Sequence, residues 1–122
     1  MGNGATVSPI DCPGQDVFQH VTSKWGFALL TVLGSGPKRF HVLRDTLDGI
    51  SEKVLAQTLR DLTRDGLIGR SASETVPPQV SYFLTEAGQA AAAHLLGLSR
   101  WIAESLDLIA VARVTFDEAA AA

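Results

Sequence analysis

The chain has 122 residues, of which 46% are hydrophobic and 19% are charged, and its formal net charge is −3 at pH 7. This length suits one domain with a core of its own, and the composition is typical of a soluble globular protein. No apolar run approaches the roughly 20 residues of a membrane-spanning helix, and no secretory signal is recognisable at the start. A single cysteine excludes an internal disulfide framework, so we expect a cytoplasmic protein.

The N-terminal part of the chain reads as a tail followed by two helices. Residues 1–11 are rich in glycine and polar residues, which predicts a mobile tail. A helix is expected to begin next, because Pro13 at a first helical position loses no hydrogen bond, and Val17 and Phe18 give this helix an apolar side. A second helix over 24–33 is apolar nearly all round, which places it in the core.

Two further helices are predicted on either side of a tight turn. Residues 34–37 end the preceding helix, and 38–40 have the character of a short strand. Residues 41–47 form a third helix, and Asp48–Gly49 is the turn that follows it. Two helices joined by such a turn match the helix-turn-helix pattern, in which the second helix contacts the bases of DNA.

The helix after this turn has a clear start, two different faces and a clear end. Ser51 can accept a hydrogen bond from a free amide of the first turn, and Gly66 can take the left-handed conformation that ends a helix. One face carries leucines at helical spacing, namely Leu55, Leu59 and Leu62. The other face is polar and carries Lys53, Gln57, Arg60 and Arg64.

This polar stripe has two interpretations. Most such stripes are simply solvated faces, but three cations and one glutamine also suit the major groove of DNA. The distribution of charge favours DNA, although a net charge of −3 does not. Residues 36–70 hold seven Lys or Arg and five Asp or Glu, a net +2, whereas the remainder holds three basic and eight acidic residues, a net −5.

A two-stranded hairpin is predicted directly after this helix. Residues 67–72 and 80–84 read as strands, and the polar loop 73–79 between them contains Pro77–Pro78. A hairpin in this position is the wing of a winged helix-turn-helix, and it would lie along the minor groove or the phosphate backbone. The fold class is therefore mainly α, as an α+β winged helix-turn-helix domain over 12–112.

A long helix is predicted to follow the wing, with Thr85 as its cap and Glu86 in its first turn. Apolar residues recur near heptad spacing, with Trp101 beside them: Ala91, Leu95, Leu98, Ile102, Leu106 and Ile109. Such a stripe is more often core than interface, but the outer half of this helix has nothing left in its own chain to cover it. We therefore expect a two-fold homodimer through this helix and through Val17 and Phe18. Residues 113–122 are expected to be a frayed tail.

The chain resembles the HxlR-type transcriptional regulators over residues 12–101. The resemblance is carried by Cys12–Pro13, Lys24–Trp25, Gly36–Pro37, Arg39–Phe40, Leu43–Arg44, Gly49–Ile50–Ser51, Lys53–Val54–Leu55, Leu59–Arg60, Leu62, Asp65–Gly66–Leu67, Val76–Pro77–Pro78, Val80, Tyr82, Leu84–Thr85 and Gly88. It implies a homodimer that binds a palindromic operator in double-stranded DNA and regulates nearby genes, for which we expect repression. Many relatives respond to a chemical stress or a small molecule, some of them through a cysteine near the N-terminus.

Specific roles follow for the polar residues. We expect Ser51, Lys53 and Gln57 to reach base edges, with Gln57 suited to adenine and Lys53 to guanine. Phosphate contacts are assigned to Lys24, Arg39, Arg60 and Arg64. In the wing, Gln79 stands where the family pattern usually has arginine, so we expect weaker or redistributed wing contacts, for which Arg70 is a candidate to compensate.

Cys12 has two interpretations, and the residues alone favour neither. Near a helix N-terminus a thiolate is stabilised, which suits a redox or electrophile sensor, but a small buried packing residue is equally expected there.

Other chemistry finds little support. His20, His41 and His94 lack metal-ligand spacing, and no phosphate or dinucleotide motif is present, so no enzyme, metal or cofactor is expected. Two alternatives stay open: a small-molecule sensor with a pocket lined by Trp25 and Trp101, and a protein-interaction dimer with weak or lost DNA binding.

Overall fold

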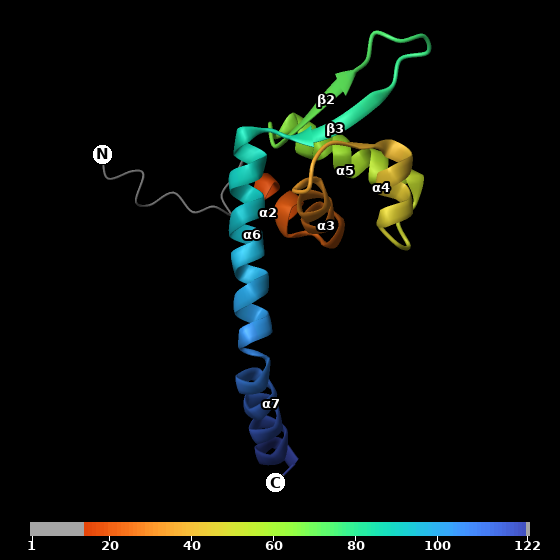
Figure 1. The fold of residues 1–122 in the computed structure, drawn as a ribbon. Coiled ribbons are helices and arrows are strands. Elements are labelled where there is room, and N and C mark those ends of the chain that lie inside the picture. Colours follow the sequence, from red (N-terminus) through yellow and green to blue (C-terminus); the bar gives the residue numbers. More distant parts are fainter. Residues whose placement is uncertain (1–13, 122) are drawn as a thin grey trace, which may run out of the picture.

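The computed structural model describes residues 14–121, which contain six helices and a small three-stranded sheet (Figure 1). The elements in chain order are α2 (Gly14–Thr22), α3 (Lys24–Leu33), β1 (Lys38–Arg39), α4 (Phe40–Thr46), α5 (Glu52–Arg64), β2 (Ile68–Ala72), β3 (Val80–Leu84), α6 (Glu86–Glu104) and α7 (Leu106–Ala121). This is the predicted winged helix-turn-helix, with α4 and α5 as its two helices. Within the described residues, no helix combines the length and the hydropathy needed to cross a membrane.

Local signals define both ends of α5. The Ser51 hydroxyl accepts a hydrogen bond from the Val54 amide at 3.1 Å, which confirms the predicted cap. Gly66, just beyond the helix, has a φ of +80°, a conformation that glycine adopts without steric cost. The turn before the helix uses Gly49 in the same way, at a φ of +89°. These residues fix where α5 begins and ends, and so which side chains it carries.

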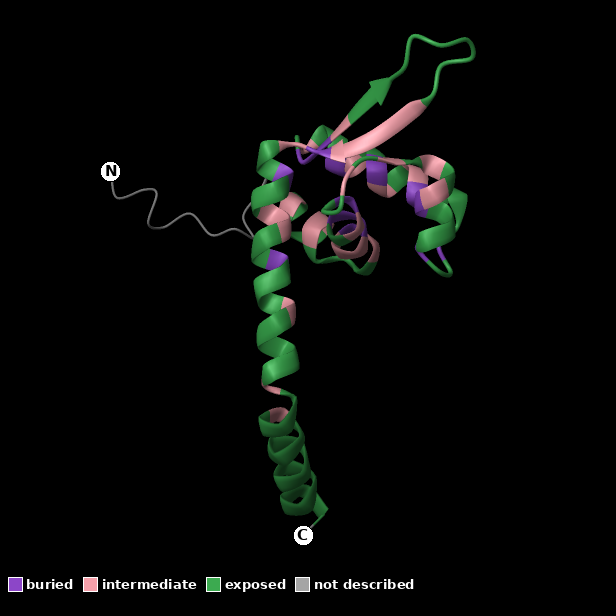
Figure 2. Cartoon of the chain, in the orientation of Figure 1, coloured by how far each residue is buried: buried purple, intermediate pink, exposed green. Residues whose placement is uncertain are grey.

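A core of leucines joins the helix-turn-helix to α3. Leu29 and Leu30 of α3 are fully buried and belong to one cluster with Leu43 of α4 and the three leucines of α5 (Leu55, Leu59 and Leu62). Burial of each leucine side chain contributes about 1.5–3 kcal/mol. The inner face of α5 is therefore set against α3, and its opposite face is left to solvent (Figure 2).

The wing is joined to the rest of the domain by a sheet of strand order β1–β3–β2, all antiparallel. The short strand predicted over 38–40 is present as β1, in which Arg39 pairs with Ser81 of β3. At the base of the wing, the Thr85 hydroxyl donates to the Gly66 carbonyl at 2.6 Å and accepts from the Gly88 amide at 3.1 Å. One side chain thus links the end of α5 to the start of α6.

Helices α6 and α7 form an arm that extends away from the domain (Figure 1). The sequence predicts a single helix ending near residue 112 and a frayed tail over 113–122, but the structure has a break at Ser105 and a second helix that continues to Ala121. The alanine-rich end has a high intrinsic helix propensity, which explains this difference. Most of the arm is exposed (Figure 2).

Two glycines of α6 provide a matched test of the packing at the base of this arm. A methyl group on Gly88 would lie 1.9 Å from the Leu67 carbonyl oxygen, whereas one on Gly97 would meet nothing within 4 Å. We expect Gly88→Ala to lower the free energy of unfolding by about 1–3 kcal/mol through overpacking. Gly97→Ala should raise it by up to about 1 kcal/mol, since alanine is the better helix former. Urea unfolding measures both, and equal effects would contradict the close contact.

Candidate nucleic-acid interface

The outward face of α5 presents the four polar residues that the sequence singles out: Lys53, Gln57, Arg60 and Arg64, all of them exposed. At about 100° per residue, these four positions fall within an arc of about 60°. They are thus neighbours on the face opposite the buried leucines, as a helix that reads the major groove requires. Ser51 lies directly before α5 as its cap, with its oxygen engaged by the Val54 amide and its hydroxyl hydrogen free to donate.

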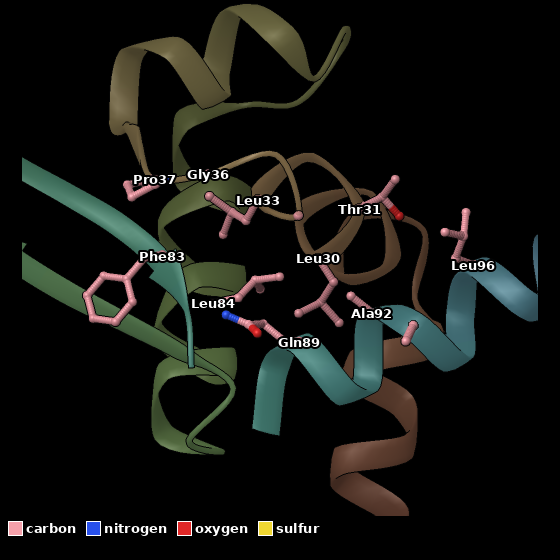
Figure 3. Close-up of a pocket in the computed structure, with 12 residues that line it drawn as sticks. Leu30, Thr31, Leu33, Gly36, Pro37, Phe83, Leu84, Gln89, Ala92 and Leu96 are labelled. Carbon is pink, nitrogen blue, oxygen red and sulfur yellow. The ribbon is translucent and has the colours of Figure 1, made fainter. Parts of the chain in front are cut away.

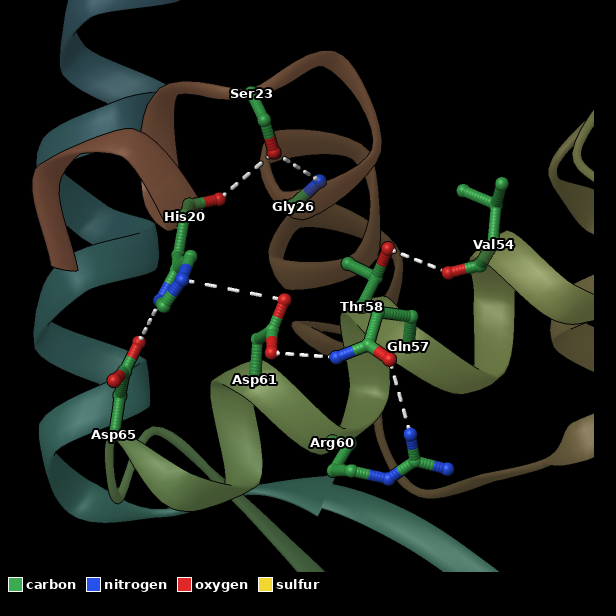
Figure 4. Close-up of polar contacts among 9 residues, drawn as sticks. All are labelled: His20, Ser23, Gly26, Val54, Gln57, Thr58, Arg60, Asp61 and Asp65. Carbon is green, nitrogen blue, oxygen red and sulfur yellow. Dashed lines mark hydrogen bonds and ion pairs between the residues drawn. The ribbon is translucent and has the colours of Figure 1, made fainter. Parts of the chain in front are cut away.

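The side-chain amide of Gln57 is already hydrogen-bonded at both ends (Figure 4). Its Nε2 donates to Asp61 Oδ1 at 2.9 Å, and its Oε1 accepts from Arg60 Nη1 at 3.0 Å. A bidentate contact to adenine would need one donor and one acceptor, and Nε2 and Oε1 each retain a second hydrogen-bonding position. Any rearrangement of the two internal bonds would cost little, because exposed hydrogen bonds contribute only about 0.5–1.5 kcal/mol each.

A hollow between α5 and the wing brings three arginines together. It has a volume of about 430 Å³ and is lined by Arg60 and Arg64 of α5, Arg70 of β2 and Tyr82 of β3, among others. No carboxylate lines it, so the local charge is positive although the whole chain is acidic. Several guanidinium groups around one concave surface suit a phosphate of the DNA backbone.

Gln79 has a partner that its sequence position alone does not reveal. Arg39 of β1 donates a hydrogen bond from Nη2 to Gln79 Oε1, where the wing loop meets β3. An arginine at position 79 would instead bring two like charges together. The glutamine therefore holds Arg39 beside the start of β3, and the effect on wing contacts with DNA stays a prediction.

An ion-pair bridge joins the two helices of the helix-turn-helix and was not anticipated from the sequence. Arg44 of α4 contacts Glu52 at the start of α5 at 3.1 Å, and it contacts the neighbouring Asp45 at 3.4 Å. The hydrogen bonds to Glu52 and Asp45 raise the pKa of Arg44 further above its ordinary value. The bridge is exposed, so its role is to orient side chains rather than to add much stability.

His20 also has a role that the sequence did not suggest. Its Nδ1 lies 2.5 Å from Asp65 Oδ2 at the end of α5, and its Nε2 lies 4.0 Å from Asp61 Oδ2 (Figure 4). Because Asp61 also bonds Gln57, a polar chain runs from α2 to the outward face of α5. His20 and Asp65 are 45 residues apart, so only the tertiary structure reveals the contact.

One expected site residue, Lys24, is not brought together with this surface. Lys24 lies at the start of α3, and its ammonium stands 4.7 Å from the centre of the Trp25 ring as a cation–π contact. No contact in residues 14–121 joins it to the α5 face, so its phosphate role stays a prediction. Cys12 lies outside the described residues, and so does the helix start that the sequence predicts at residues 11–13. Within residues 14–121, no cluster of three potential metal ligands occurs.

The residues expected at a dimer interface fall into two groups. Phe18, Leu98, Ile102 and Leu106 are exposed by 43–56%, whereas Val17 and Ile109 are half-buried. Leu95 differs from the expectation, because it is only 7% exposed and belongs to the core cluster of its own chain. Its side of α6 faces the core, so it is not available to a second copy.

These features define a winged helix-turn-helix protein whose second helix carries three cations on its outward face. The chain belongs to the HxlR-like helix-turn-helix family, whose sequence profile matches residues 20–109.

Individual relatives agree with this assignment. The HTH-type transcriptional regulator YtfH of Escherichia coli (strain K12) is 42% identical over 110 residues, which cover 90% of this chain and 85% of that protein. The structure of the regulator ytfH from Salmonella typhimurium is similar, with a TM-score of 0.72 and 40% identity over 83% of this chain and 90% of that one. The redox regulator HypR in its reduced form has a TM-score of 0.71 and 29% identity over 81% and 98% of the two chains.

The His20 contact can be tested by mutation. The Asp65 side chain is 7% exposed and the imidazole is its partner, so His20→Ala leaves this carboxylate without a hydrogen bond in a nearly buried place. We expect the free energy of unfolding to fall by about 1–3 kcal/mol. His41→Ala, at an exposed position of α4, is the matched control and should change it by less than about 0.5 kcal/mol. Similar effects of the two variants in urea unfolding would show that the contact contributes nothing.

Proposed function

We propose that the protein is a repressor that binds a palindromic operator in double-stranded DNA as a homodimer, with the outward face of α5 in the major groove. The observation that carries the proposal is the exposed arc of Lys53, Gln57, Arg60 and Arg64 on a helix whose other face is locked in the core. The family supplies the general activity, since its members are named as HTH-type transcriptional regulators.

The positions of the side chains support a division of labour. Ser51 caps α5, and Lys53 and Gln57 lie in its first half. We assign all three to base edges, because residues in the N-terminal part of a recognition helix contact the bases. Arg60, Arg64 and Arg70 surround the hollow beside the wing and are assigned to phosphates. Arg39 and Gln79 act as a pair where the wing loop meets β3.

The exposed arm supports dimerisation. Large apolar side chains that are 43–73% exposed follow α6 and α7: Leu98, Trp101, Ile102, Leu106, Leu108, Val111, Val114 and Phe116. An apolar surface of this extent is costly in water and typical of an interface. A two-fold dimer would place two α5 helices on one duplex, about 34 Å apart for successive major grooves. We include Phe18, Val17 and Ile109 in this interface, and we omit Leu95.

A protein-interaction module without DNA binding is the less supported alternative. The three arginines of the hollow and the absence of a carboxylate among its lining residues favour a polyanion as partner. Response to an oxidant through Cys12 is supported by the similarity to HypR, which is described as a redox regulator. It is a separate proposal from DNA binding.

Binding to DNA selected from random duplexes by the purified protein tests the assignments. Gln57→Ala should lose preference at one base pair in each half-site, a reduction in discrimination of about 1–3 kcal/mol. Arg60→Ala should weaken binding to all sequences alike and reduce the slope of log K against log salt by about 0.9 per lost phosphate contact. The salt titration separates the two effects.

The matched control for Arg60→Ala is Arg100→Ala, which removes an exposed cation from α6 and should leave the slope unchanged. If Lys53→Ala/Arg60→Ala binds random duplex as tightly as the wild-type protein, the proposed DNA surface is wrong.

Dimerisation through the arm is tested by charge insertion. Leu98→Asp and Ile102→Asp each place a carboxylate in the proposed interface, where its burial is unfavourable. We expect both variants to have the mass of a monomer rather than a dimer in light scattering, and to bind the operator at least tenfold more weakly. Ala103→Asp, at an exposed position about 140° around the same helix from Leu98 and about 100° from Ile102, should remain a dimer. A wild-type protein that is monomeric at micromolar concentration would refute the dimer.

A further inference from the structure

A second hollow lies away from the DNA-facing surface, between α3, β3 and α6 (Figure 3). It has a volume of about 660 Å³ and includes the loop that joins α3 to β1. Its wall contains Leu30, Leu33, Pro37, Phe83, Gln89 and Leu96, among others. We call it the α3–α6 groove. Its volume lies within the range of about 300–1,000 Å³ that small-molecule sites occupy.

The lining of the groove indicates what kind of molecule it suits. Every residue that lines it is uncharged, and most are apolar. Two side chains offer hydrogen bonds: the Gln89 amide, which bonds no other residue in the described part of the chain, and Thr31. The Thr31 hydroxyl donates to the Phe27 carbonyl at 2.9 Å, so its oxygen can still accept. Figure 3 shows the Gln89 side chain extending from α6 alongside Leu84 and Leu30.

The groove is distinct from the surface proposed for dimerisation. Its α6 wall is made by Gln89, Ala93 and Leu96. At about 100° per residue, Leu96 lies about 160° around the helix from Leu98. A second copy that covers Leu98 would therefore leave the groove open. Neither Trp25 nor Trp101 lines it, so it is not the pocket named in the small-molecule alternative of the sequence analysis.

The walls of the groove belong to elements with different roles. Phe83 and Leu84 lie on β3, the returning strand of the wing, and the Phe83 ring packs on Gly69, where a methyl group would approach it to 2.3 Å. The opposite wall is α6, which carries the proposed interface. A molecule held between them would favour one placement of the wing relative to the arm.

We propose that the α3–α6 groove binds an uncharged, largely apolar or aromatic small molecule with one hydrogen-bond donor or acceptor for Gln89. Occupation of the groove changes the affinity of the dimer for its operator. This second statement rests on the proposed function, whereas the binding itself does not.

The fluorescent probe N-phenyl-1-naphthylamine tests the binding, because it is uncharged, has two aromatic groups and carries one N–H donor. We expect saturable binding of one probe per chain to the full-length protein without DNA. Ala93→Trp fills the groove from its α6 wall and should weaken binding at least tenfold. Ala90→Trp adds the same ring at an exposed α6 position outside the groove and should leave the affinity unchanged. Gln89→Leu, which removes the acceptor, should weaken binding about three- to tenfold.

The outcomes separate this inference from the proposed function. The proposed binding site is wrong if the wild type and Ala93→Trp bind the probe with equal affinity. It is also wrong if Ala93→Trp and Ala90→Trp lose the same amount of probe affinity. If the site is correct, saturating probe should change operator affinity in the wild type and not in Ala93→Trp. Probe binding to a protein that does not bind DNA would overturn the proposed function and leave the groove intact.

Discussion

The fold depends on the packing of the leucine face of α5 against α3. Leu55, Leu59 and Leu62 are buried with Leu29 and Leu30, and this contact fixes the rotation of α5 about its own axis. A rotation by one residue would expose a leucine and turn a cation inward, which is unfavourable for both. The outward direction of Lys53 and Gln57 is therefore a consequence of core packing rather than of any contact that these two residues make.

A second constraint joins the wing and the arm to this core. The Thr85 side chain links Gly66, just beyond the end of α5, to the first turn of α6. His20 of α2 contacts Asp65, the residue before Gly66. The end of α5 is thus the point where the wing, the arm and the first described helix meet. A displacement of α2 or α6 relative to the core would be transmitted to α5 through short polar contacts. This is the physical route by which dimer geometry and groove occupation would change DNA affinity in the proposed mechanism.

The sequence predicted those parts of the structure that have local signals. The Ser51 cap, the leucine spacing of α5, the hairpin and the Thr85 cap each depend on residues within a few positions of one another. The pairs His20–Asp65 and Arg39–Gln79 are 45 and 40 residues apart, and the α3–α6 groove is built from three separate segments, so neither the pairs nor the groove has a pattern in the chain. Leu95 shows the same limit, because heptad spacing does not distinguish a leucine that faces its own core from one that faces a second copy.

The internal bonds of Gln57 affect how sharply the protein can distinguish one operator from another. If a side chain that contacts bases has no hydrogen-bond partner in the free protein, its donor and acceptor are left unsatisfied when it faces the wrong base. Gln57 can instead keep its hydrogen bonds to Asp61 and Arg60. An incorrect base pair would then lack a contact with Gln57, but no group would be left unsatisfied. In the proposed binding mode, the penalty for a wrong base pair at this position would be the lost contact alone, toward the lower end of about 1–3 kcal/mol. Operators that differ there would be bound with graded affinities rather than rejected.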